Sequence, residues 1–76
     1  MIFKIDKTLD VRGLRSSRLK APAMDVIGKM AAGQVVQVIA DDREAKQEMP
    51  QLCKSMGWEL VDLSEQGGVL SFIIKT

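Results

Sequence analysis

The spacing of hydrophobic residues changes along this chain, and the first half predicts a strand, a helix and a second strand. Residues 2–8 alternate between apolar and polar positions in a mostly period-two pattern, which is typical of a half-exposed strand. From Ser17 the apolar residues recur every three or four positions as far as Met30, which predicts a helix with one buried side, and Gly33 ends it. The β-branched run at residues 35–40 predicts a central strand buried on both faces.

The second half predicts another helix followed by a hairpin. Asp41 or Asp42 is expected to cap the helix, and Gly57 to end it. Together with Glu44, these aspartates gather at the N-terminus of the helix, where its dipole favours acidic residues. Pro50 lies inside the apolar stripe, so we expect the helix to kink or to restart near Met49.

Two further strands are expected at residues 58–63 and 69–74. Gly67 and Gly68 lie between them and can adopt the positive φ angles of a tight turn. The predicted order is βαβαββ in one α/β domain spanning residues 1–76, which is long enough for a single small core. Handedness rules alone do not fix whether both helices cover the same face of the sheet.

The overall composition is that of an ordinary globular domain. Hydrophobic residues make up 46% and charged residues 28%, and no apolar run is long enough to span a membrane. The first residues lack the pattern of a secretory signal, so we expect a cytoplasmic protein with no membrane partner. One cysteine and no histidine exclude an internal disulfide and the common zinc and nucleophile–base sites, and we expect neither a metal nor a cofactor.

Positive charge gathers where the first strand meets the first helix. Arg12, Arg15, Arg18 and Lys20 occupy this turn, although a helix N-terminus favours acidic residues. Residues 1–33 carry a net charge of +4 and residues 34–76 a net charge of −3. The cluster therefore indicates a binding surface for an anionic group or partner.

The same turn carries a family resemblance. Residues 10–15, Asp-Val-Arg-Gly-Leu-Arg, resemble the entry to the TusA/SirA sulfur-carrier family, in which a Cys-Pro-X-Pro motif follows directly and opens the first helix. Gly33, residues 34–40, Asp41-Asp42 and residues 49–57 fit family positions at the same spacing. The resemblance implies a two-layer α/β sandwich, with two helices on one face of a four-stranded mixed sheet, similar to the C-terminal domain of translation initiation factor three.

The resemblance places Ser16 at the position of the family's sulfur-carrying cysteine. Ser17 and Leu19 stand where the motif has its two prolines. A serine hydroxyl cannot hold persulfide sulfur, so the catalytic position is expected to be inactive and enzymatic activity stays open. The residues expected to bind a partner are Asp10, Arg12, Gly13, Arg15, Ser17 and Arg18.

Other residues of this region and of the second helix have structural explanations. Ser16 or Ser17 is expected to cap the first helix, and Asp10 to pair with Arg12 or to accept N–H groups of the turn. Cys53, the one thiol, lies in the apolar stripe of the second helix and is expected to be a buried core residue. We expect Trp58 to pack beneath a helix. Four methionines are also expected to fill the core: Met24, Met30, Met49 and Met56.

Three functions follow as hypotheses. The first is a relative of the sulfur carriers that acts in or beside sulfur relay by binding a protein such as a cysteine desulfurase, without a carrier thiol. The second is a working persulfide carrier, in which Ser16 is an engineered replacement of a cysteine or Cys53 carries the sulfur. The third is a weak, salt-sensitive nucleic-acid or anion-binding module, which the lack of interleaved aromatic residues disfavours.

Overall fold

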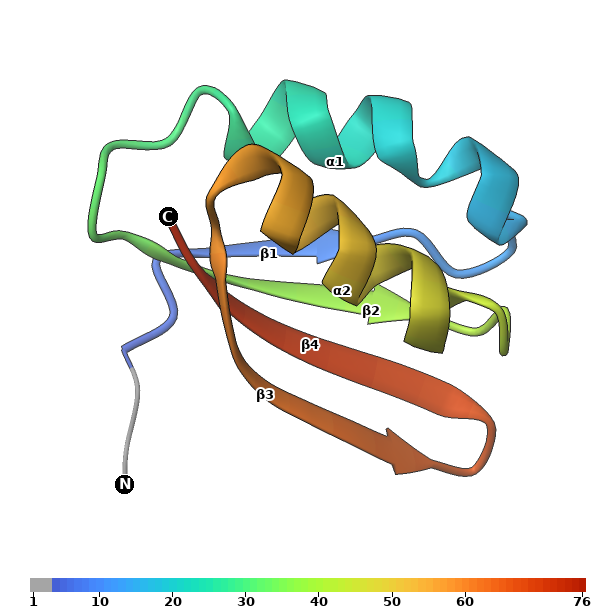
Figure 1. Ribbon diagram of the computed structural model, residues 1–76. Helices are drawn as coiled ribbons and strands as arrows, with labels where there is room; N and C mark the ends of the chain where they lie inside the picture. Colours follow the sequence, from blue (N-terminus) through green and yellow to red (C-terminus); the bar gives the residue numbers. More distant parts are fainter. Residues whose placement is uncertain (1–3) are drawn as a thin grey trace.

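The computed structural model describes residues 4–76 as two layers, with both helices on one face of a single sheet (Figure 1). Each layer contains segments from both halves of the chain. The strands are β1 (Lys7–Asp10), β2 (Val35–Ala40), β3 (Glu59–Gln66) and β4 (Val69–Lys75), the helices are α1 (Lys20–Ile27) and α2 (Ala45–Met56), and a 3₁₀ turn, η1 (Ser16–Arg18), precedes α1.

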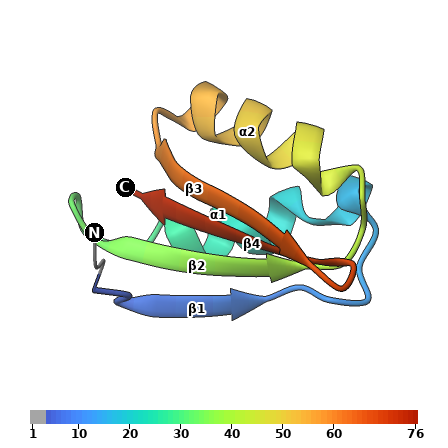
Figure 2. The same ribbon diagram turned by 90° about the horizontal axis from the view of Figure 1, so that it is seen from below.

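The order of strands in the sheet explains why both helices lie on the same face. The order is β1-β2-β4-β3, with β1 parallel to β2 and with β4 antiparallel to both β2 and β3 (Figure 2). The β1-α1-β2 and β2-α2-β3 connections therefore both cross the sheet in the same direction. Because such crossovers are right-handed, the two helices must cover one face, as the family resemblance implied.

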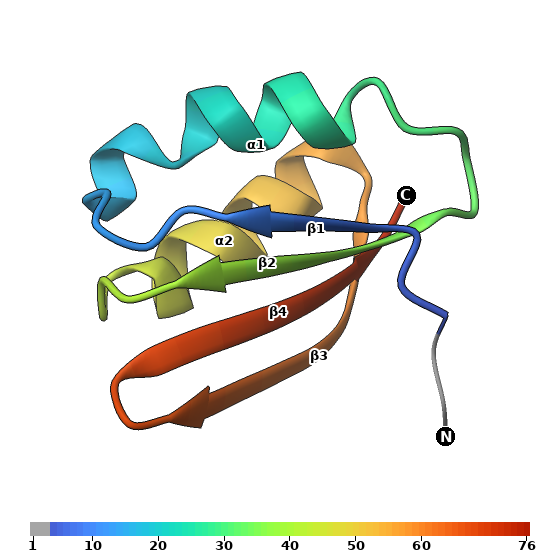
Figure 3. The same ribbon diagram turned by 180° about the vertical axis from the view of Figure 1, so that it is seen from behind.

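The core lies between the helices and this face of the sheet. Val36, Val38 and Ala40 of β2 alternate with the partly exposed Gln37 and Ile39 on the opposite face. The expectation that β2 is buried on both faces is therefore wrong, because no helix or strand within residues 4–76 covers the second face (Figure 3).

β1 lies later in the chain than predicted. Lys7 pairs with Val36, and Asp6 N–H donates to the carbonyl oxygen of Val35, the first residue of β2. Lys4 and Ile5 therefore have no β2 residue opposite them, and residues 2 and 3 of the predicted strand lie outside the described part of the chain.

α1 is shorter than predicted: it ends at Ile27, whereas the sequence predicted an end at Gly33. Gly28 is its C-cap, and a Cβ built there would lie 2.5 Å from the carbonyl oxygen of Met24. Met30 still packs against the core from the loop that follows, which explains its helix-like spacing. Gly33 has φ +88° and leads into β2.

α2 begins at Ala45, three residues after Asp42. Its N-cap is Glu44, whereas the sequence predicted Asp41 or Asp42, and no side chain caps the helix. The helix continues through Pro50, so the predicted restart near Met49 is wrong. Gly57 ends the helix in a left-handed conformation with φ 76°, as expected, and Trp58 N–H donates to the carbonyl oxygen of Cys53.

The hairpin and its neighbours largely match the prediction. β3 and β4 extend almost to each other, so that Gly67 and Gly68 alone form the turn, and both have positive φ. Trp58 packs against the core. Among the methionines, Met49 is buried and Met30 partly buried, whereas Met24 and Met56 are exposed, so the core assignment was wrong for these two.

No helix within residues 4–76 is both long and apolar enough to cross a membrane.

Met49 and Met56 test the assignment of the core on a single helix. Met49 is 1% exposed and Met56 is 39% exposed. We expect Met49→Ala to lower the free energy of unfolding by about 2–5 kcal/mol, because it leaves a cavity. Met56→Ala should change it by less than about 0.5 kcal/mol, since it alters surface. Urea unfolding followed by circular dichroism measures both, and equal effects would contradict this packing.

Candidate functional site

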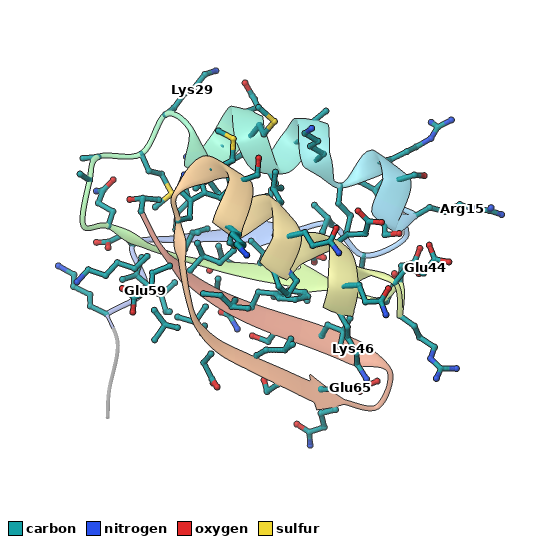
Figure 4. The ribbon with its side chains drawn as sticks, viewed as in Figure 1. Arg15, Lys29, Glu44, Lys46, Glu59 and Glu65 are labelled. Carbon is teal, nitrogen blue, oxygen red and sulfur yellow. The ribbon has the colours of Figure 1, made fainter. Side chains whose placement is uncertain are left out.

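The predicted site lies where two loops meet at one edge of the sheet. β1 and β2 are parallel neighbours, so their carboxyl ends lie at the same edge and the segments that follow them are close. Asp10 through Arg18 follow or end β1, and Asp41 through Glu44 follow β2. Figure 4 shows Arg15 and Glu44 at this end of the molecule, with Lys29 at the opposite end.

Backbone N–H groups of the first loop donate to carboxylates of the second. Gly13 N–H donates to Asp41 Oδ1 at 2.9 Å, and Ser16 N–H donates to Asp42 Oδ2 at 2.8 Å. The other oxygen of Asp42, Oδ1, accepts the N–H of Glu44 at 3.0 Å. The bonds to Asp42 from Ser16, the larger cause, and from Glu44 lower the pKa of this carboxyl below its ordinary value.

Asp10 and Arg12 form the pair that the sequence predicted. Asp10 Oδ1 accepts both the backbone N–H and the Nε–H of Arg12, each at 3.0 Å, and Oδ2 accepts from Nη2 at 2.8 Å. Hydrogen bonding to the guanidinium lowers the pKa of Asp10 and raises that of Arg12. Asp10 therefore fulfils both expected roles, as ion-pair partner and as acceptor of a turn N–H.

Ser16 does not cap a helix, contrary to prediction. Neither η1 nor α1 has a side-chain cap, and the residues before them are Arg15 and Leu19. Instead, the Ser16 hydroxyl donates to Glu44 Oε2 at 3.1 Å. Ser16 is 4% exposed and is the one buried polar residue in the part of the chain that the structure describes. Ser17 is exposed on η1.

Some of the cations remain available to a partner. Within residues 4–76, Arg15, Arg18 and Lys20 are exposed and form no salt bridge. Of the four cations in the cluster, Arg12 alone is paired, with Asp10. The backbone groups that would bind an external anion at Gly13 and Ser16 already donate to Asp41 and Asp42. The chain's own carboxylates therefore occupy these two backbone donors, whereas the side chains of Arg15, Arg18 and Lys20 stay exposed.

A cavity of about 300 Å³ opens beside Ser16, between the start of α1 and α2. Its buried lining includes Leu19, Met49 and Leu52, and the exposed Lys20 and Glu48 also line it. Gln51 and Ser55 complete the lining, so the cavity has buried apolar side chains at its base and polar or charged residues around them.

Cys53 does not line this cavity; it lies on the side of α2 that faces the core. It is 2% exposed, and burial raises the pKa of its thiol to about 11. The sequence-based interpretation of Cys53 as a core residue is confirmed. The thiol is far from the thiolate state that sulfur transfer requires.

Sequence reasoning missed the part that Asp41, Asp42 and Glu44 play here. It assigned them to the N-terminus of the second helix, where the helix dipole favours acidic residues. A signal was present in the sequence. A helix predicted between the first two strands favours parallel pairing of those strands, and parallel pairing brings together the residues that follow each of them.

Comparison with known proteins agrees with this architecture. The family model described as Sulfurtransferase TusA matches residues 7–76, from the first residue of β1 to the end of the chain. The chain belongs to the TusA family. Among TusA proteins, the sulfur carrier protein TusA of Allochromatium vinosum is 34% identical over 70 residues, covering 92% of each chain. The sulfur carrier protein TusA of Pseudomonas aeruginosa is 28% identical and covers 99% of this chain and 95% of its own.

A solved structure shares the fold. The SirA-like protein from Desulfitobacterium hafniense superposes with a TM-score of 0.80 at 24% identity, covering 92% of this chain and 96% of its own. This likeness confirms the two-layer arrangement of helices and sheet that the TusA resemblance implied.

The Asp42 carboxylate should stabilise the folded protein in a pH-dependent way. Its folded pKa lies below the ordinary value of 3.8, so its contribution is present above that pH and is lost as the pH falls through the folded value. We expect Asp42→Asn to lower the urea midpoint of unfolding at neutral pH. The difference in midpoint between the variant and the unmodified protein should disappear in acid. Asp25→Asn is the control, since Asp25 forms only an exposed ion pair with Lys29. A gap that stays constant with pH would contradict this role.

Cys53 should resist alkylation in the folded protein. Both its burial and its raised pKa of about 11 leave little accessible thiolate at neutral pH. We expect iodoacetamide to modify it slowly under native conditions and readily in urea, as measured by intact mass. Native alkylation at the rate of an unfolded control peptide would show that the thiol is accessible.

Proposed function

We propose that this TusA-family chain acts in or beside sulfur relay by binding a protein partner, without carrying sulfur at residue 16. The observation that carries the proposal is the state of Ser16: its hydroxyl is buried and bonded to Glu44, in a chain that matches the family model over residues 7–76. A hydroxyl in that position offers no thiolate to accept sulfur.

The surface around Ser16 supports a binding role. Arg15, Arg18 and Lys20 are exposed and lie within four residues of Ser16 in sequence. Lys20 also lines the cavity, together with the buried Leu19 and Met49. Such a surface favours an acidic protein face with an apolar side chain at its centre. The family's partners are proteins of sulfur relay, so a cysteine desulfurase or a sulfur acceptor is the proposed partner, and the cytoplasm is the proposed location.

The two alternatives have less support. A carrier that uses Cys53 would need the thiol to leave the core, where burial raises its pKa. A nucleic-acid or anion-binding module could use the exposed cations, but no aromatic residue lies among them in sequence, and the backbone N–H groups of Gly13 and Ser16 already bond to carboxylates. An engineered Ser16 remains testable, because reverting it should then restore sulfur loading.

A binding experiment tests the partner. We expect the protein to bind an immobilised bacterial cysteine desulfurase saturably, and Arg15→Glu/Arg18→Glu to weaken binding by about tenfold or more, because it reverses two charges at the contact surface. Lys29→Glu is the matched control, since Lys29 lies at the other end of the molecule (Figure 4). Absence of binding to a desulfurase and to sulfur-relay acceptors, or equal effects of both variants, would overturn the proposal.

Sulfur loading is measured in the same reaction. After incubation with the desulfurase, cysteine and pyridoxal phosphate, we expect the intact mass of this chain to stay unchanged. A carrier TusA protein in the same mixture should gain less sulfur as this chain is added, because both compete for one docking surface. A gain of one sulfur atom on this chain would instead place the activity at Cys53.

A further inference from the structure

The side chain of residue 16 is held by carboxylates of the β2–α2 loop. Ser16 Oγ donates to Glu44 Oε2 at 3.1 Å, and its backbone N–H donates to Asp42 Oδ2 at 2.8 Å. Both contacts are made by a residue that is almost fully buried. In this geometry the hydroxyl is a hydrogen-bond donor, and Glu44 is its acceptor.

The other charges around residue 16 come from three segments. Arg15 precedes it on the same turn and interacts with Asp42, Lys20 lies at the start of α1, and Glu48 belongs to α2. No cationic side chain hydrogen-bonds to Ser16 within residues 4–76, whereas Glu44 does. The nearest full charge that residue 16 contacts through its side chain is therefore negative.

We propose that Glu44 is a specificity-determining residue that excludes an anionic sulfur from position 16. The inference rests on the proposed function, which locates the lost carrier site at Ser16. Replacing Ser16 by cysteine is then insufficient to restore sulfur transfer, because a thiolate would face a carboxylate at hydrogen-bonding distance. A like charge this close disfavours ionisation and raises the pKa of a thiol.

The transfer step shows why that charge matters. A thiolate at residue 16 attacks the terminal sulfur of a donor persulfide, R–S–SH, and forms a new S–S bond. The old S–S bond breaks with its electron pair on the donor sulfur, which leaves as the thiolate RS⁻, and residue 16 now carries –S–SH. The reaction needs a thiolate as nucleophile, and Glu44 opposes its formation.

Thiol titration tests this in variants that all carry Cys53→Ala, so that one thiol remains. The variants compared are Ser16→Cys alone, Ser16→Cys with Glu44→Gln, and Ser16→Cys with Glu48→Gln. Glu48 is the matched control, because it lines the same cavity without bonding to Ser16. The pKa of the introduced thiol is measured from the pH dependence of its alkylation by iodoacetamide.

We expect Glu44→Gln to lower the thiol pKa by about one unit or more relative to Ser16→Cys alone, which raises the thiolate fraction at neutral pH about tenfold. Glu48→Gln should change the pKa of the introduced thiol much less. Glutathione persulfide should add one sulfur atom, seen by intact mass, faster to the Glu44→Gln variant than to Ser16→Cys alone. Glu44→Ala serves as a second variant if Glu44→Gln fails to fold by circular dichroism.

Two results would overturn the inference. One is a thiol in Ser16→Cys that already titrates below an ordinary cysteine, and the other is an equal effect of the changes at Glu44 and Glu48. These measurements need no partner protein, so their failure leaves the binding proposal standing. Loss of desulfurase binding would likewise leave the thiol titration unchanged.

Discussion

The parallel pairing of β1 with β2 is the constraint on which the site depends. It brings the turn after β1 against the loop after β2, so that Gly13 and Ser16 can donate their N–H groups to Asp41 and Asp42. These carboxylates also supply negative charge next to a turn that carries several arginines. A cationic helix entry that looks unfavourable on its own is thus balanced by residues almost thirty positions away in sequence.

The sequence predicted the order of elements and most of the core, because both depend on local periodicity. The buried residues on the two predicted stripes are Leu19, which directly precedes α1, Ala23 and Ile27 of α1, and Ala45, Met49 and Cys53 of α2. The predicted ends of the helices and strands were less accurate, because they depend on contacts with segments distant in sequence. β1 begins where β2 can pair with it, and Met30 reaches the core from a loop although its spacing is that of a helix.

Within the candidate site, the local contacts could be predicted from the sequence and the tertiary contacts could not. The resemblance directed attention to Asp10 through Arg18, and the pair of Asp10 with Arg12 follows from their closeness in sequence. The contacts of Ser16 with Asp42 and Glu44 could not be found in the same way, because they join residues 26 and 28 positions apart. Capping was the local explanation for Ser16, and a tertiary hydrogen bond replaced it.

The pairing of Ser16 with Glu44 also explains how the family fold tolerates a hydroxyl at a buried position. A buried cysteine behaves as a small hydrophobe and needs no strong hydrogen-bond partner, whereas a buried hydroxyl without an acceptor destabilises the protein. Glu44 supplies that acceptor, and no buried side-chain polar atom within the described residues lacks a partner. The apolar core between the helices and the sheet takes no part in this arrangement. A single residue of the neighbouring loop thus satisfies the buried hydroxyl of Ser16 without a contribution from the apolar core.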